Sequence, residues 1–583
     1  MTGIKLKSTP GKRLSFLMVI TVMKFTQEKK IMKYGRYSLL VITLLLGTAH
    51  AADFQDGMMH DGQMYGEVFD DLFDMEGEDL FLAEAAAGEN LDITRAIISP
   101  DDAVRNLTAP DLVNAQVILQ NPLYYRSNPP IRRNVIDFPI FQQFVQRGEH
   151  RQEFAFKPFF VQTFKEYFYD TRSNINYYID MLQNELNAQI DLLTQIEDID
   201  FKGFNLSNVL GLFETIYLEQ RRAGFMFEYV RATERWTLSL RLPFLYDEHN
   251  LNMPEEDQAA VQSNPFFSDS SFDEMTFARE HLIADRLGFG DTRINLEYLI
   301  VESKKQIFSA GVRVTLPTAF AVKKGLYGTT FDAYAPAPAF NLYNDLLLPG
   351  LSTPPDQNIP LVQQNIQTLG NAVMDRLSTM VLESPSGNNH HLGLGIFSHN
   401  TMIFTNRLSL SGLASAEILL PATERRFFIT YTPQAAYNVF DWEDTSAQSG
   451  QLQQKLTFLN EQFINKFFPT GYDVTVFPGL IIQSTSALTY EGKHVDFTAG
   501  TDLWWTTREK FLSIEAPENI KTTVLDPNTA KKGYGYQSMF WFSLEKKVRP
   551  GSSWRLGLRA QATANSFGVG QDWGACILIQ KQF

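Results

Sequence analysis

The chain has 583 residues, a formal net charge of -15 and a mean hydropathy of -0.18. The acidic balance argues against nucleic acid as a partner, because phosphate binding needs clustered lysine and arginine. The low hydropathy argues against a bundle of membrane-spanning helices. It suits a membrane β-barrel, since half of each strand and all the loops are polar. The single cysteine, Cys576, excludes an intramolecular disulfide framework and a cysteine-based zinc site.

A cleavable export signal is predicted at residues 32–51. The apolar run is too short to span a bilayer as a helix, so we expect a mature chain that begins near Ala52. Residues 1–31 carry a second apolar patch, and the simpler hypothesis is that they are an overhang upstream of a true start at Met32. The signal consists of a positive start, an apolar core and a small-x-small cleavage site, which are Lys33 and Arg36, residues 39–46, and Ala49 with Ala51.

Acidic residues dominate the segment that follows the signal. Residues 52–94 carry many aspartates and glutamates but no lysine or arginine, which is typical of a solvated tail. A more specific alternative is that these carboxylates bind a cation, but the segment lacks the Asp-x-Asp-x-Asp-Gly loop of calcium sites. We interpret residues 52–150 as an acidic periplasmic extension or as a plug inside the domain that follows.

The rest of the chain, residues 151–583, is rich in segments in which apolar and polar residues alternate. Between Trp554 and Ala564 the even-numbered residues are all apolar, whereas the odd-numbered ones include Arg555 and Arg559. Side chains of a strand repeat their direction every two residues, so this segment has one apolar and one polar face. Many such strands, joined by alternating short turns and long loops, are typical of an antiparallel barrel of the bacterial outer membrane.

A secreted β-sandwich or propeller would also show alternation. Here, however, the apolar faces continue over about four to six positions, which matches a lipid band of roughly 25 Å. Repeats of about 40–50 residues, which a propeller would show, are missing. We therefore predict an all-β membrane protein with a closed antiparallel transmembrane β-barrel.

The number of strands is the open part of this prediction. About thirteen can be counted, but bacterial single-chain barrels have an even number. Residues 391–421 are ambiguous, because they fit either two strands or three. We predict about 12–14 strands, prefer 14 and place 12 second. Apolar residues at helical spacing also predict helical loop insertions, among them 175–193, 361–382 and 444–467.

Charged residues recur on the polar faces of the strands. A charge that faces lipid costs a few kcal/mol at mid-bilayer, so these side chains are predicted to line the lumen. They could form an aqueous constriction that selects solutes by charge, or cross-strand ion pairs that satisfy a polar interior. Because both signs are mixed, we favour structural pairing. The candidates are Glu228, Arg241, Arg293, Glu297, Arg313, Asp496, Asp502, Arg555 and Arg559.

The chain ends in an amphipathic strand with a terminal aromatic, Phe583, although Lys581 interrupts the apolar face. This ending resembles the signal that the barrel-assembly machinery reads. The phrases GFGD at 288–291 and VTLPT at 314–318 resemble strand-edge phrases of channels with roughly 12 to 14 strands. The resemblance is to Gram-negative porins, long-chain fatty-acid transporters and phenol-pathway channels, and it implies an N-terminal plug.

Two classes of function remain. The first is an outer-membrane channel for passive uptake or exchange of small solutes, hydrophobic ones included. The alternative is a closed structural or surface-interaction barrel that uses its large loops, 247–289 and 321–389. Outer-membrane lipid, the assembly machinery and small solutes are the expected partners, and the oligomeric state is left open. No cofactor or metal is expected, and no enzymatic activity, because His390 and His391 lie near serines only in sequence.

Overall fold

The computed structural model describes the part of the chain that forms a barrel. Described are residues 131–142, 150–165, 217–252, 278–332, 387–428, 434–442, 468–516, 527–548 and 553–583, with shorter pieces at 276, 364–382, 430, 454–462 and 525. All belong to one compact unit, Asn90–Phe583. The predicted export signal, the acidic run at 52–94 and the predicted helix at 175–193 lie outside the described residues.

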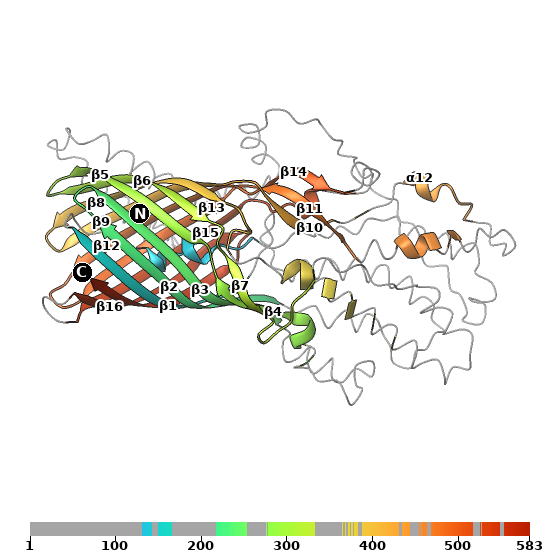
Figure 1. Ribbon diagram of the computed structural model, residues 1–583, viewed down its shortest axis with the longest axis horizontal. Coiled ribbons are helices and arrows are strands. Elements are labelled where there is room, and N and C mark those ends of the chain that lie inside the picture. The colour runs from blue at the N-terminus through green and yellow to red at the C-terminus, as the bar shows by residue number, and fades with distance from the viewer. Residues whose placement is uncertain are drawn as a thin grey trace, which may run out of the picture. The chain divides into compact units, whose positions relative to one another are not determined.

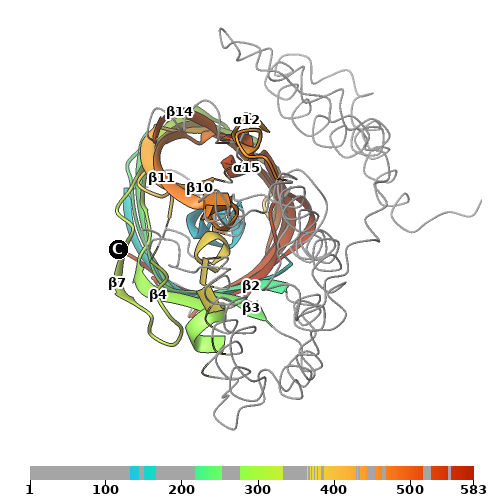
Figure 2. The ribbon, with the colours of Figure 1, turned by 90° about the vertical axis from the view of Figure 1, so that its right-hand side faces the viewer.

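Twelve antiparallel strands close into a ring, seen from the side in Figure 1 and along its axis in Figure 2. Each pairs with the next, and the last pairs with β1, so the ring has no free edge. The strands are, in order, β1 (Arg151–Lys165), β2 (Tyr217–Ala232), β3 (Trp236–Asn252), β5 (Thr292–Glu302), β6 (Gln306–Leu316), β8 (Gly393–Thr405), β9 (Leu408–Leu419), β12 (Gly479–Glu491), β13 (Asp496–Thr506), β15 (Gly535–Lys547), β16 (Trp554–Phe567) and β17 (Gln571–Gln582).

Five ring strands continue past one end of the ring as a second strand after a short interruption. Pro317, Pro421 and Pro478 occupy three of the interruptions, where the missing N–H of proline removes a ladder hydrogen bond. Two continuations remain in the main sheet and three form a separate sheet. They are β4 (Ile283–Phe289), β7 (Phe320–Lys324), β10 (Ala422–Phe428), β11 (Thr470–Phe477) and β14 (Lys510–Glu515).

The closed membrane barrel is confirmed, but its ring has twelve strands, the lower end of the predicted range, and not the preferred fourteen. Part of the difference lies in residues 391–421, which form two strands and not three. β8 runs without a break through His399 and Asn400, two adjacent polar residues that are both buried. They interrupt the alternation of the sequence, but both have hydrogen-bond partners, so the strand continues: Gln306 of β6 donates to Asn400, and Thr401 of the same strand pairs with His399.

Side chains that point out of the ring form an apolar belt. On β16, Leu556 and Leu558 are each 48% exposed, whereas Arg559, which points inward, is 4% exposed. The Lys581 amine, which interrupts the apolar face of β17, lies over the rings of Trp554 and Phe583 at 5.4 and 4.5 Å. Such a cation suits the aromatic girdle where a barrel meets the lipid headgroups.

Several short helices accompany the strands, and described residues within 364–382 and 454–462 are also helical. η1 (Val135–Asp137) and η2 (Pro139–Phe141) are single 3-10 turns inside the ring (Figure 2). η3 (Ala278–Leu282) is a π-helical turn before β4, α12 (Gln434–Tyr437) follows β10, and α15 (Pro527–Ala530) packs against β10. Among the described residues, we find no helix with the length and apolarity that a membrane crossing needs.

Candidate functional site

Residues 131–142, here called the plug segment, lie inside the ring. The Asn134 side chain caps η1 by accepting the Ile136 amide, and Pro139 starts η2, where a missing N–H does no harm. The two turns place five apolar side chains against the inner wall, where all are buried. These are Val135, Ile136, Phe138, Ile140 and Phe141, which pack with wall residues that include Phe159, Val161, Met226, Leu245 and Met539.

Arg133 connects the plug segment to β13. Its guanidinium donates to the Asp502 carboxylate at 2.5 Å and to the Asp137 carbonyl at 2.6 Å, and it is fully buried. Asp502 also accepts from Gln483 and Thr485 of β12 at 3.0 and 2.5 Å. The wall therefore supplies a prearranged acceptor for the one arginine that the plug segment places there.

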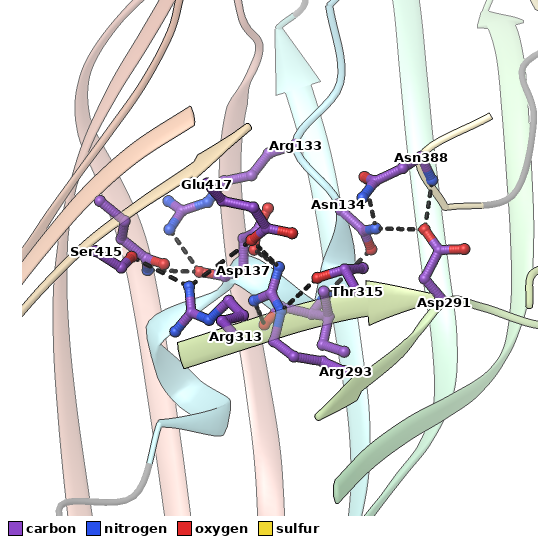
Figure 3. Close-up of polar contacts among 12 residues, drawn as sticks. Arg133, Asn134, Asp137, Asp291, Arg293, Arg313, Thr315, Asn388, Ser415 and Glu417 are labelled. Carbon is purple, nitrogen blue, oxygen red and sulfur yellow. Dashed lines mark hydrogen bonds and ion pairs between the residues drawn. The ribbon is translucent and has the colours of Figure 1, made fainter. Parts of the chain in front are cut away.

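Asp137 makes the second charged contact, shown in Figure 3. Its carboxylate lies 2.5 Å from the Arg293 guanidinium of β5, and Arg293 lies 3.2 Å from Glu417 of β9. Arg313 of β6 is 3.9 Å from the same glutamate and donates to Ser415. Two arginines thus face two carboxylates, and one of the carboxylates belongs to the plug segment.

Backbone carbonyls at the end of η2 form the third set of contacts. A helical turn leaves its last carbonyls without internal partners. Lys157 of β1 donates to the Phe141 carbonyl at 3.0 Å, and Arg559 of β16 donates to those of Ile140 and Gln142 at 3.1 and 2.6 Å. Glu228 of β2 holds Lys157 at 2.5 Å and Arg241 at 2.6 Å, so these cations are themselves positioned.

Asp291 occupies the interruption between β4 and β5 and is completely buried. It accepts hydrogen bonds from the Asn134 amide of the plug segment at 3.1 Å and from the Asn388 backbone at 2.5 Å (Figure 3). The Ala319 backbone donates to it at 3.3 Å. Burial raises the pKa of Asp291 to about 6, although these donors and Arg293 oppose the shift. One carboxyl thus connects the plug segment, the next interruption and the loop before β8.

Seven of the nine lumen candidates lie on the inner wall near charged or polar partners. Arg241, Arg293, Asp502 and Arg559 contact the plug segment directly. Glu228 and Arg313 act through a neighbour, and Glu297 contacts Ser309 and His399. The remaining two, Asp496 and Arg555, are half-buried at the end of the ring where the short turns lie. The inward charges are therefore arranged mainly as mixed-sign pairs.

Sequence reasoning missed the plug-side partners and two wall residues. Arg133 and Asp137 lie in a segment without periodicity, so nothing in the pattern marked them. Lys157 shares its strand parity with Ala155 and Phe159, which are also buried, and that parity could have identified it. Glu417 lies in the region where the number of strands was ambiguous, so its direction could not be assigned.

Fold and site together define a transmembrane β-barrel of the outer-membrane type with residues 131–142 inside its ring. No protein-family model matches the chain, and no curated protein matches it. Solved structures with a similar fold are outer-membrane channels and porins. The COG4313 outer membrane channel from Pseudomonas putida F1 aligns over 76% of this chain and 99% of its own, with 8% identity and a TM-score of 0.37.

Two further structures align with lower scores. The Pseudomonas putida toluene transporter TodX covers 79% of this chain and 96% of its own, at 9% identity and a TM-score of 0.27. The NanC porin covers 62% and 93%, at 7% identity and a TM-score of 0.24. These scores are low, so the description of the barrel rests on its own strand pairing and the description of the site on its own contacts.

Proposed function

We propose that the protein is an outer-membrane channel for passive uptake or exchange of small solutes, with residues 131–142 as its gate. The observation that supports this most is the kind of contact that holds the plug segment. Arginine and lysine of the wall bind its carboxylate and its backbone carbonyls, and water can replace each of these contacts. A permanent seal made only of apolar packing would lack such exchangeable partners.

The size of the ring supports the same function. Barrels of about eight strands are filled by their own side chains, whereas those of about 16–18 strands leave an aqueous channel. A ring of twelve lies between, so its lumen is wide enough to need an additional segment to fill it. Removal or shift of the plug segment would leave an inner wall that carries Arg293, Asp502 and Arg559. Water can solvate these charged side chains, so the lumen would then hold water.

Export and assembly are part of the proposal. The apolar belt of the ring fits a lipid bilayer, and we infer cleavage after Ala51 followed by insertion in the outer membrane. The terminal strand β17 closes the ring against β1. Phe583, which follows β17 directly, is proposed to be read by the barrel-assembly machinery.

Single-channel conductance of the full chain in planar bilayers tests the gate. The variant Arg133→Met with Asp137→Asn removes the Arg133–Asp502 and Asp137–Arg293 ion pairs. It leaves Asp502 its hydrogen bonds from Gln483 and Thr485, and it leaves Arg293 paired with Glu417. We expect longer and larger conductance steps than in the wild type. The matched control, Arg425→Met with Asp473→Asn, removes an ion pair from the separate sheet, where the two side chains are 25% and 32% exposed. It should behave as the wild type.

The alternative function, a closed structural or surface-interaction barrel, has one observation in its favour. The plug segment is anchored on several sides of the wall at once, with both members of the Arg133–Asp502 pair fully buried. If the double variant is folded and remains without conductance steps, as does the wild type, the channel is rejected and the structural barrel stands. Folding is checked by the heat-dependent electrophoretic mobility that a closed barrel shows.

A further inference from the structure

A cavity of about 50 Å³ lies between the start of the plug segment and the wall formed by β2, β3 and β4. It has room for about three or four water molecules, at about 15 Å³ each. Four of its twelve lining residues are arginines, and a single lining residue is acidic. The lining consists of Arg132, Arg133, Asn134, Val135, Gln220, Arg222, Leu245, Asp247, Arg286, Gly288, Gly290 and Gly387.

Two of these arginines keep an unused donor. Arg133 and Arg222 are 2% and 4% exposed, and the Nε–H of each has no hydrogen-bond partner among the described residues. Their other guanidinium nitrogens are occupied, because Arg222 donates to the Arg133 carbonyl and to Asp572, and Arg133 to Asp502. A buried donor of a charged group that stays unsatisfied is destabilising, so an acceptor at this place would be stabilised.

The ring of Phe138 keeps the two guanidinium groups in place. It packs against both, with the Arg133 and Arg222 guanidinium carbons at 5.3 and 4.8 Å from its centroid. This packing restricts the two side chains that line the cavity, which reduces the conformational entropy that is lost when a ligand binds.

Charge and size point to the kind of acceptor. Asp502, Asp572 and Asp247 lie within 3.3 Å of Arg133, Arg222 and Arg286, respectively. They neutralise much of the positive charge, which favours a singly charged group over a dianion. A carboxylate has three heavy atoms, matches the volume, and accepts N–H donors on both oxygens.

We propose that this cavity binds the carboxylate of a small organic acid, so that solutes with such a group are held at the plug segment. The proposal rests on the channel function for its physiological meaning, but binding itself needs no transport. The apolar part of such a solute would extend beyond the cavity, past Leu245 and Val135, which are among its lining residues.

Isothermal titration calorimetry of the folded full chain in detergent tests the site, with benzoate as the probe. The neutral analogue benzamide has the same shape and is the matched ligand control. We expect benzoate to bind and benzamide to bind at least tenfold more weakly. Arg222→Met should weaken benzoate binding by about tenfold or more, the effect of a lost charged hydrogen bond. Arg425→Met, in β10 outside the ring, should leave it unchanged.

Arg222→Lys covers the case in which the methionine variant fails to fold. It keeps the positive charge beside Asp572 but removes the Nε donor, and we expect it also to weaken benzoate binding. Equal binding of benzoate and benzamide by the wild type, or benzoate binding that survives both Arg222 variants, would overturn the proposal. Conductance without benzoate binding would reject this site alone. Benzoate binding without conductance would reject the channel and keep the site.

Discussion

The Arg133 guanidinium of the plug segment and the Asp502 carboxylate of β13 meet at 2.5 Å, and neither side chain is exposed to solvent. They are 369 residues apart in the chain. A buried ion pair is weak support for stability by itself, because desolvation offsets the Coulomb attraction. Separating the two side chains is nevertheless strongly unfavourable, because each would remain as a buried charge without a partner. The pair therefore fixes where the plug segment lies in the lumen.

We predict that Asp502→Asn lowers the free energy of unfolding by about 3–5 kcal/mol, because it leaves the Arg133 charge buried without a carboxylate. Denaturant unfolding of the detergent-folded protein measures this value. The double variant Arg133→Met with Asp502→Leu should recover most of the loss, since an apolar pair needs no compensation. A double variant as unstable as Asp502→Asn would show that the pair contributes more than mutual neutralisation.

The contacts of Arg293 predict which of two substitutions lowers the free energy of unfolding more. Asp137→Asn leaves Arg293 with Glu417 at 3.2 Å, so we expect a loss of about 1–2 kcal/mol. Arg293→Met leaves both Asp137 and Glu417 without their nearest cation, and the expected loss is about 3–5 kcal/mol. Unfolding midpoints of the two variants, measured side by side, should preserve this order. Equal effects would contradict the shared role of Arg293.

Asp291 predicts that the plug segment is held more firmly in acid. Its pKa is raised to about 6 in this closed arrangement, from an ordinary value of 3.8, because the carboxyl is buried. The protonated form is thus favoured here, and the stabilisation it gives is lost as pH rises through 6. A shift of this size allows up to about a hundredfold change in the closed-to-open ratio, a factor of ten for each pKa unit.

The measurement is the open probability in planar bilayers between pH 5 and 7.5, which we expect to rise with pH. Arg293 is the charged group that most opposes the shift of Asp291. Asp291→Asn cannot ionise and should stay near the low open probability of the acid form at every pH. If its pH profile equals that of the wild type, another group is responsible.

The apolar belt predicts that an outward-facing charged side chain destabilises the protein only when it lies on a ring strand. Leu558→Arg on β16 should lower the free energy of unfolding by about 2–4 kcal/mol when the protein is folded in lipid vesicles. Val439→Arg, at a residue that is 78% exposed outside the ring, should change it by less than about 0.5 kcal/mol. Similar losses in both variants would mean that the belt around Leu558 does not face lipid.

Part of the site could be predicted from local pattern alone. Alternation with a period of two placed Arg293, Asp502 and Arg559 on the inner face, because a charge on the other face would meet lipid. The same alternation identified the membrane barrel. It did not identify the number of strands, since polar residues such as His399 and Asn400 interrupt the alternation within one continuous strand.

The partners of those charges required the tertiary structure. Arg133 and Asp137 belong to a segment without a repeating pattern, and each meets a wall residue 369 or 156 residues away in sequence. Which charges meet depends on the register of every strand around the ring and on the depth that the plug segment reaches. The sequence by itself determined the direction in which residues point in strands with regular alternation, because direction is a local property of the extended backbone. Only the closed ring decided which side chains lie together, since that follows from contacts between strands distant in the chain.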